Sequence, residues 1–228
     1  MDKLKIPPLI KAAVTVYFDN NLKIVENKSV FYDQIKVNFP KIIYPENKFL
    51  KYPMGDVSFF ASSFDKVIEI NANAFSLSDF KYQDFKTYMQ IIKNNIAVFN
   101  TTYSIDKFNS FNLVYENSII LNKAIGERFN DYFTIDFNFK GNKEKTFLAT
   151  MGNFAFKVQD GLLNIEISPV LSVKNITEKY KFSITFLSAF STSVSLEKLL
   201  DSISAGHEFI DDIFEKSLTE NYLKTIRN

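Results

Sequence analysis

Apolar side chains recur with two different periods along the first half of the chain. Apolar residues at every second position indicate a strand, and apolar residues three and four positions apart indicate a helix. These periods predict strand, helix, strand, strand, helix and strand over residues 12–18, 29–39, 49–62, 66–74, 78–99 and 108–121. Ser29 and Ser78 stand at expected helix N-cap positions, and Pro40 ends the first helix. This order is that of a split βαβ arrangement, in which two helices cover one sheet face.

The second half is richer in extended segments. After a short helical stretch at 122–130, strands are predicted over residues 133–140, 146–158, 162–174 and 180–191. Gly141-Asn142 and Asp160-Gly161 are turn dipeptides, so neighbouring strands are expected to pair antiparallel. A last helix begins at the cap Ser195 and carries apolar residues at helical spacing almost to the end.

We therefore predict an α+β fold with antiparallel sheets, helices on one face and a long closing helix. The first half is βαββαβ and covers residues 1–121. The second half covers residues 122–228 and consists of antiparallel strands followed by the C-terminal helix. Because no linker-like composition separates the two halves, we expect them to pack as one compact unit.

Composition narrows the class of protein. The 228 residues are 46% hydrophobic and include 25 Phe, which supplies a large core and excludes disorder for most of the chain. Lys and Arg number 27 against 26 Asp and Glu, so the chain lacks the one-signed charge of a duplex-binding protein. Pro7, Pro8 and Lys11 interrupt the N-terminus, which does not resemble a signal peptide, and no apolar run approaches a membrane span. A cytoplasmic protein without membrane or nucleic-acid partners is expected.

Few side chains offer catalytic chemistry. The chain has no Cys and a single His, which excludes disulfides, thiolate nucleophiles and cysteine-ligated zinc. Six dispersed Gly residues form neither a phosphate-binding loop nor a dinucleotide fingerprint, and no cofactor is predicted. Ser195 and Lys198 have the spacing of a serine-lysine catalytic pair, but an N-cap serine followed by an acidic first turn explains them better. The many aromatic residues are interpreted as core rather than as a base-stacking surface.

The single histidine allows two interpretations. His207, Asp211 and Glu215 lie four residues apart on one helical face, and carboxylates with one imidazole could hold Mn or Mg. This is a weak metal candidate, because metalloprotease helices place a second His at the next position. We favour a structural clasp, in which His207 lies on the buried side of the helix and needs a hydrogen-bond partner. Tyr115 and Asn117 on a central strand are the expected partners.

Three segments resemble a sporadically distributed family of uncharacterised prokaryotic proteins. PPLIKAAVTVYFD, residues 7–19, is similar to the family's Pro-Pro-x-x-Glu-Ala-Val start. LVYENSII, residues 113–120, keeps Tyr115 and Asn117 of its Arg-Tyr-x-Asn strand. The family's C-terminal helix is matched by Leu200, His207-Glu208, Phe214-Glu215 and Thr219.

Lys11 and Val114 depart from this pattern, because the family has Glu and Arg there, so a pairing between those two charges is absent in this chain. The resemblance spans nearly the full length and implies an α+β fold, with no established enzymatic activity. The predominance of Lys over Arg and the abundant Asn and Ile are also typical of an A/T-rich prokaryotic genome.

The missing catalytic motifs predict a non-enzymatic binding or assembly protein with a protein partner or self-association. The family's patchy distribution implies an accessory component of a mobile prokaryotic system such as antiviral defence. A second hypothesis is a carrier that holds a small apolar ligand between the sheet and the last helix. A third is a metal-dependent enzyme that uses the acidic C-terminal helix.

Overall fold

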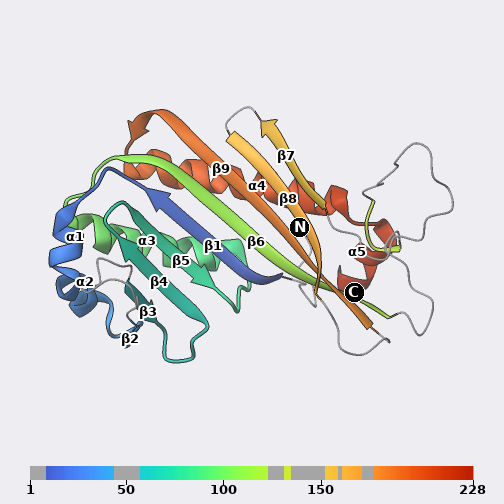
Figure 1. Cartoon of the computed structure of the whole chain (residues 1–228), viewed down its shortest axis with the longest axis horizontal. Coiled ribbons are helices and arrows are strands. Elements are labelled where there is room, and N and C mark those ends of the chain that lie inside the picture. Colours follow the sequence, from blue (N-terminus) through green and yellow to red (C-terminus); the bar gives the residue numbers. More distant parts are fainter. Residues whose placement is uncertain are drawn as a thin grey trace, which may run out of the picture.

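The computed structural model describes residues 9–43, 57–122, 131–134, 152–158, 161–170 and 177–227. Within these ranges the strands form one sheet in the order β2-β3-β4-β5-β1-β6-β9-β8-β7, and every neighbouring pair is antiparallel (Figure 1). The strands are β1 Leu9–Tyr17, β2 Lys41–Ile43, β3 Val57–Phe60, β4 Lys66–Asn71, β5 Ala74–Asp79, β6 Phe108–Asn122, β7 Gly152–Val158, β8 Gly161–Val170 and β9 Thr177–Val194. The helices are α1 Leu22–Glu26, α2 Lys28–Ile35, α3 Phe85–Tyr103, α4 Leu196–Ser217 and α5 Glu220–Arg227. The predicted α+β class is confirmed.

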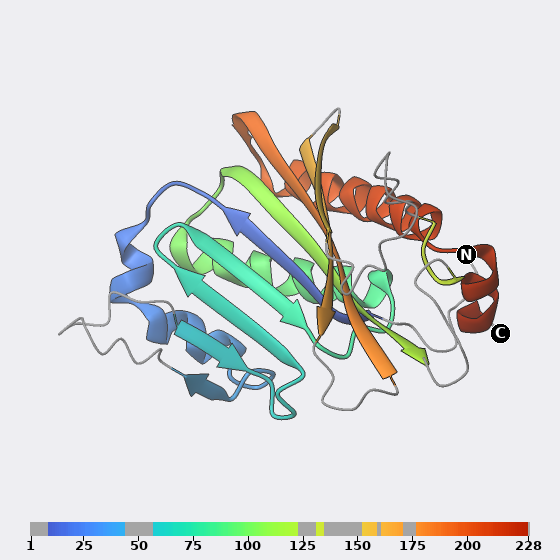
Figure 2. The same ribbon diagram turned by 45° about the vertical axis from the view of Figure 1, so that its right-hand side comes forward.

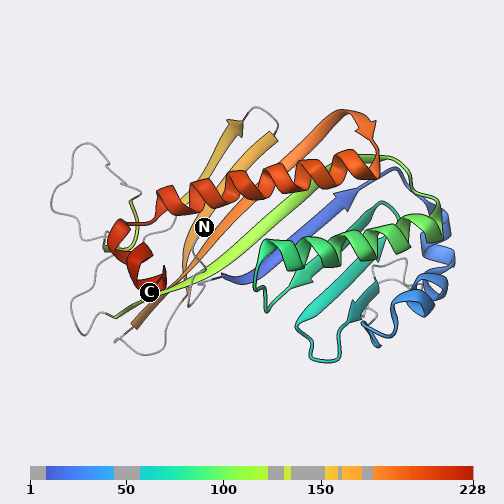
Figure 3. The same cartoon turned by 180° about the vertical axis from the view of Figure 1, so that it is seen from behind.

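The split βαβ unit is formed by β5, α3 and β6. Both strands pair antiparallel with β1, so they run parallel to each other with β1 between them. Helices α3 and α4 lie on the same face of the sheet, as the view from behind shows (Figure 3). The sheet twists strongly, so that β7 and β8 cross the direction of β4 and β5 (Figure 2). Helices on one face of an antiparallel sheet were expected, and the structure has this arrangement.

The core lies between the helices and one face of the sheet. On β1, Ala12, Val14 and Val16 point to this face and are fully buried. Their cross-strand neighbours on β6 are Tyr115, Leu113 and Phe111, which are also buried. Phe rings of α2 and α3 pack against the same face, so the abundant Phe serves as core, as expected.

The prediction of a helix from Ser78 was wrong. Residues 74–79 form β5, and α3 begins at Phe85. Ser76 and Ser78 alternate with apolar neighbours, which is a strand period, and the true N-cap is Asp84, whose Oδ1 accepts a hydrogen bond from the Thr87 amide at 2.8 Å.

The first helical region is also divided differently. The short helix α1 was not expected, and its N-cap Asn21 accepts a hydrogen bond from the Lys23 amide at 3.0 Å. Helix α2 is preceded by Asn27 rather than capped by Ser29, and it ends at Ile35, before Phe39. Asn is favoured at cap positions, and Asn21 caps α1 with its side chain, whereas Asn27 precedes α2 without a side-chain cap hydrogen bond.

The second half follows the predicted hairpin pattern where the structure describes it. Val158 and Gly161 are directly paired, so Gly161 begins β8 instead of lying in the turn that was predicted at Asp160-Gly161, and Asp160 lies outside the described residues. The predicted helix at 122–130 falls outside the described residues except for Asn122, which ends β6. The predicted strand 133–140, the start of 146–158 and the Gly141-Asn142 turn also lie largely outside them.

The closing helix begins at the predicted cap. Ser195 Oγ accepts a hydrogen bond from the Lys198 amide at 3.4 Å, so this Ser-Lys pair is a helix cap. The helix ends at Ser217, because Leu218 forms an isolated antiparallel bridge with Phe133, and the short α5 follows. None of the helices in the described ranges is long and apolar enough to cross a lipid bilayer.

Candidate functional site

Helix α4 packs directly on strands β6 and β9. Its buried residues Leu199, Ile203, Gly206 and Ile210 recur every three or four positions and therefore share one face. At Gly206 an added Cβ would lie 2.9 Å from Cδ1 of Phe186 on β9, so only glycine fits this contact without a shift. The close approach places the next residue, His207, at the edge of the core.

Both ring nitrogens of His207 are engaged. Nδ1 lies 2.8 Å from the hydroxyl of Tyr115, and Nε2 lies 3.3 Å from Oδ2 of Asp211, one helical turn away. The Phe85 ring stacks on the imidazole with the ring centroids 3.7 Å apart. Tyr82 packs against Tyr115 at 5.6 Å between centroids and shares a hydrogen bond with its hydroxyl. We call these five residues the His207 centre.

Three elements meet at the His207 centre. Strand β6 supplies Tyr115, helix α4 supplies His207 and Asp211, and the start of α3 with its preceding loop supplies Phe85 and Tyr82. The first residue of α3 reaches α4 here because Asp84 caps the helix at this point. The centre therefore links helices α3 and α4 to the central strand β6.

Burial moves the pKa values of His207 and Asp211 in opposite directions. Desolvation lowers the pKa of His207 to about 4, so the imidazole is neutral at pH 7. Desolvation, together with the nearby carboxylate of Glu215, raises the pKa of Asp211 to about 6. Asp211 is thus ionised at pH 7 and can only accept hydrogen bonds.

The charge state of Asp211 decides the tautomer of His207. An ionised carboxylate beside Nε2 requires that Nε2 carry the proton, which leaves Nδ1 as an acceptor for the Tyr115 hydroxyl. Burial raises the pKa of Tyr115 well above its ordinary value and that of Tyr82 in the same direction, so both hydroxyls keep their protons. The centre is a hydrogen-bonded chain from tyrosine through histidine to aspartate.

This chemistry favours a structural clasp over a reaction. A tyrosine with a raised pKa is a hydrogen-bond donor rather than a nucleophile, and both imidazole nitrogens are occupied. Among the described residues, no three His, Asp or Glu side chains are placed to hold a metal ion, so His207, Asp211 and Glu215 do not form the metal site considered from the sequence.

Asn117 lies elsewhere than the clasp hypothesis expected. It is buried on β6, two residues beyond Tyr115, and its Nδ2 donates to the carbonyl oxygen of its cross-strand partner Phe182 at 3.2 Å. The structure thus brings Tyr115 to His207, and it gives Asn117 a role within the sheet.

The opposite face of the sheet carries no helix among the described elements, and Figure 1 views the molecule from this side. We call it the uncovered face. Six side chains from its three central strands are uncharged and no larger than leucine, and we call them the neutral band: Ala13, Thr15, Asn112, Val114, Thr185 and Leu187. Ala13 is only 7% exposed although no helix among the described elements covers it.

Charged residues lie at one side of the neutral band. The Lys11 Nζ is 3.6 Å from Glu116 Oε1, and the Lys181 Nζ is 3.4 Å from Glu116 Oε2. Lys11 also lies 5.9 Å from the ring centre of Phe80, which is 45% exposed. The residue that departs from the family pattern at position 11 therefore pairs with Glu116 on the neighbouring strand, whereas Val114 belongs to the neutral band.

An exposed aromatic corner adjoins these residues, because the Phe80 amide donates a hydrogen bond to the carbonyl oxygen of Asp65, the chain neighbour of Phe64, at 2.7 Å. Phe64, in the turn between β3 and β4, is 51% exposed, and its ring lies 5.5 Å from that of Phe60. The Lys41 Nζ sits 3.5 Å above the Phe64 ring. Phe64 has a φ of 55°, a left-handed conformation that is costly for a bulky side chain. An exposed aromatic ring held in this way is typical of contact surfaces.

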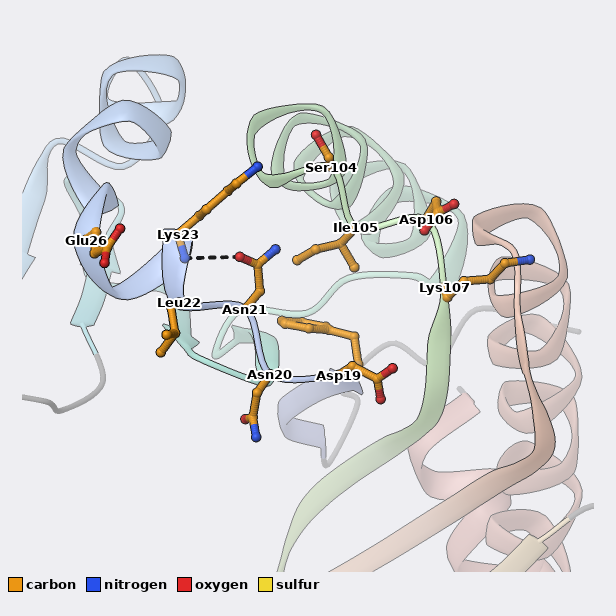
Figure 4. Close-up of a pocket in the computed structure, with 11 residues that line it drawn as sticks. Asp19, Asn20, Asn21, Leu22, Lys23, Glu26, Ser104, Ile105, Asp106 and Lys107 are labelled. Carbon is orange, nitrogen blue, oxygen red and sulfur yellow. Dashed lines mark hydrogen bonds between the residues drawn. The ribbon is translucent and has the colours of Figure 1, made fainter.

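A pocket of about 500 Å³ lies away from both features, where the β1–α1 and α3–β6 connections meet (Figure 4). Two of its polar side chains, Asn21 and Asp19, serve the fold. The Asn21 side chain caps α1 and donates to the Tyr103 carbonyl oxygen at 3.1 Å, and Asn109 donates to Asp19 at 2.9 Å. The pocket is open and is lined by polar and apolar groups to a similar extent, so it differs from the enclosed apolar cavity expected of a carrier.

Sequence reasoning missed two members of the His207 centre. Tyr82 and Phe85 were assigned to the apolar stripe of a helix, because their spacing from Tyr88 and Met89 is helical. The loop before Asp84 turns Tyr82 toward Tyr115 instead. The uncovered face had a weak sequence signal, since short polar residues alternate with apolar ones on β5, β1 and β6.

Comparison with known proteins finds no family model that matches this chain and no curated protein similar to it. Function is therefore argued from the geometry of the uncovered face and the His207 centre.

Proposed function

We propose that the protein is a non-enzymatic binding or assembly protein that contacts its partner through the uncovered face. The observation that carries this proposal is a wide sheet face of short, neutral side chains without a covering helix among the described elements. A second layer normally covers a hydrophobic sheet face, whereas an antiparallel sheet can also leave one face in water. A partner protein can supply that layer.

The residue types at the sides of this face support the proposal. Phe64 and Phe80 are exposed, and aromatic side chains are enriched in protein interfaces relative to the rest of the surface. The ion pairs of Lys11 and Lys181 with Glu116 supply a polar rim. Both signs are present, so the face offers no attraction to a strongly charged partner such as nucleic acid.

Neither alternative is favoured by the geometry to the same degree. A metal-dependent enzyme would use His207, whose two nitrogens are already paired. An apolar carrier would need space beneath α4, where Gly206 and Phe186 are in tight contact. Metal analysis of the purified protein tests the enzyme hypothesis. Native mass spectrometry with apolar ligands tests the carrier hypothesis.

We also propose the cellular setting that the family resemblance implies. In this hypothesis the protein acts in the cytoplasm of a prokaryote, as an accessory component of a mobile antiviral defence system. The absence of Cys in the chain is compatible with a reducing compartment.

Purification of the complex from the organism that encodes the chain tests the binding function. Light scattering and mass spectrometry should find the chain in a stoichiometric complex, either with itself or with another protein. Val114→Arg places a charge in the neutral band and should release the partner, whereas Ala205→Arg, at an exposed position on α4, should retain it. A lone monomer from native cells would show the proposal to be wrong.

A further inference from the structure

We infer that the partner of the uncovered face is a second copy of this chain, which packs face to face about a two-fold axis close to Val114. This inference rests on the proposed function and names its partner. Sheet-on-sheet packing of this kind places two sheets about 10 Å apart with their side chains in contact.

The size of the face fits a stable dimer. Neighbouring strands are about 4.8 Å apart, and side chains on one face recur about every 6.8 Å along a strand. The five strands β5, β1, β6, β9 and β8, with three such positions on the six-residue β5 and four or more on each of the others, cover on the order of 700 Å². A standard protein interface buries roughly 800 Å² on each partner, so the face supplies nearly the whole of it.

The charges of the face fit a second copy of itself. Lys11 and Lys181 are balanced by Glu116 and Glu166, and all four lie on one side of the neutral band. A two-fold dimer brings identical patches together, so each patch must tolerate its own copy. A patch with balanced signs does not repel its own copy, whereas a one-signed patch would.

The position of the axis follows from the neutral band. In register across the sheet, Val114 lies between Ala13 on β1 and Thr185 on β9, at the middle of the five strands. Its side chain is partly exposed and short, so two sheets can approach closely there. Residues at a two-fold axis contact their own symmetry copies, and Val114 is therefore expected to meet Val114 of the other copy.

Complementary charges at this position give a decisive experiment. The purified full-length chain, at about 100 µM, should have twice the 26.4 kDa mass of the monomer by light scattering and sedimentation, because interfaces of this size bind with micromolar or tighter affinity. Val114→Arg and Val114→Glu should each weaken the dimer about tenfold or more. An equimolar mixture of the two variants should restore it, since opposite charges then meet at the axis. Ala205→Arg should leave the dimer unchanged.

Each other outcome overturns the inference. Circular dichroism first verifies that both Val114 variants are folded, and Thr185→Arg serves in their place if either is not. A wild-type monomer at this concentration, a dimer that survives Val114→Arg, or a mixture that stays monomeric would each contradict the proposed packing. If the pure chain is monomeric but native cells yield a different protein bound in a Val114-dependent way, the binding function stands and only the second copy is wrong.

Discussion

His207 and Asp211 respond to acid in opposite ways. His207 has a lowered pKa, about 4 against an ordinary 6.5, so its contribution to the free energy of unfolding is present above pH 6.5 and is lost as the pH falls toward 4. Asp211 has a raised pKa, about 6 against 3.8, so its contribution is present below pH 3.8 and is lost as the pH rises through 6. Between pH 4 and 6 the two contributions oppose each other. The wild-type pair should therefore add little pH dependence in that window.

Substitution of either His207 or Asp211 should reveal how the remaining residue makes the free energy of unfolding depend on pH. Relative to wild type, Asp211→Asn should lose stability as the pH falls from 6.5 to 4, because only the His207 contribution remains. His207→Leu should gain stability relative to wild type as the pH falls from 6 to 4, because Asp211 remains. Thermal melts of the three proteins between pH 4 and 7 measure both slopes. Slopes of the same sign in the two variants would contradict these protonation states.

The clasp itself can be tested at one pH by substitution of the imidazole. His207→Leu removes the acceptor of the Tyr115 hydroxyl and replaces the ring stacking on Phe85 by an apolar contact, and it should cost about 1–3 kcal/mol at pH 7. His207→Asp places a second partly buried carboxylate beside Asp211 and should cost clearly more. Urea unfolding of both variants gives the comparison. Equal losses would mean that the site does not act as a buried clasp.

At the scale of elements, two serines that the sequence predicts as helix caps differ in the structure, because Ser195 caps α4 and Ser29 lies inside α2. Ser195→Ala removes a cap hydrogen bond from α4 and should destabilise the protein by about 1 kcal/mol. Ser29→Ala is the matched control, because Ser29 is an exposed residue inside α2 and should change the stability by a few tenths of a kcal/mol at most. Urea unfolding measures both. A larger loss for Ser29→Ala would restore the cap position expected from the sequence.

Some elements could be predicted from the periodicity of the sequence, and others could not. Strands β1, β6 and β9 and helix α4 have long regular periods, and each was predicted close to its position. Strand β5 was lost because Ser78 and Asp79 look like the start of a helix, and local propensity cannot distinguish a cap from a strand end. At the site, the position of His207 on the buried side of α4 predicted Tyr115 as its partner. The contacts of Tyr82 and Phe85 were not predicted, because they depend on the conformation of the loop before α3. Which sheet face remains uncovered is a property of tertiary packing, which periodicity does not specify.

At the scale of the whole molecule, one sheet joins the two halves of the chain. Strand β6 from the first half pairs with β9 from the second along nearly its whole length, and α4 lies across both strands. Leu113 on β6 and Phe186 on β9 are cross-strand partners in a shared core, so neither half can lose its packing without exposing the other. We therefore expect one cooperative unfolding transition for the chain.

Two core truncations test this cooperativity. Leu113→Ala and Ile184→Ala each remove a fully buried side chain, one from each half, and each should lower the free energy of unfolding by about 2–5 kcal/mol. Because the halves share a sheet, each variant should shift the same single transition, with far-UV circular dichroism and tyrosine fluorescence changing together. If the halves were independent, Ile184→Ala would move one transition and leave a second at its wild-type position. That result would place a domain boundary between β6 and β9.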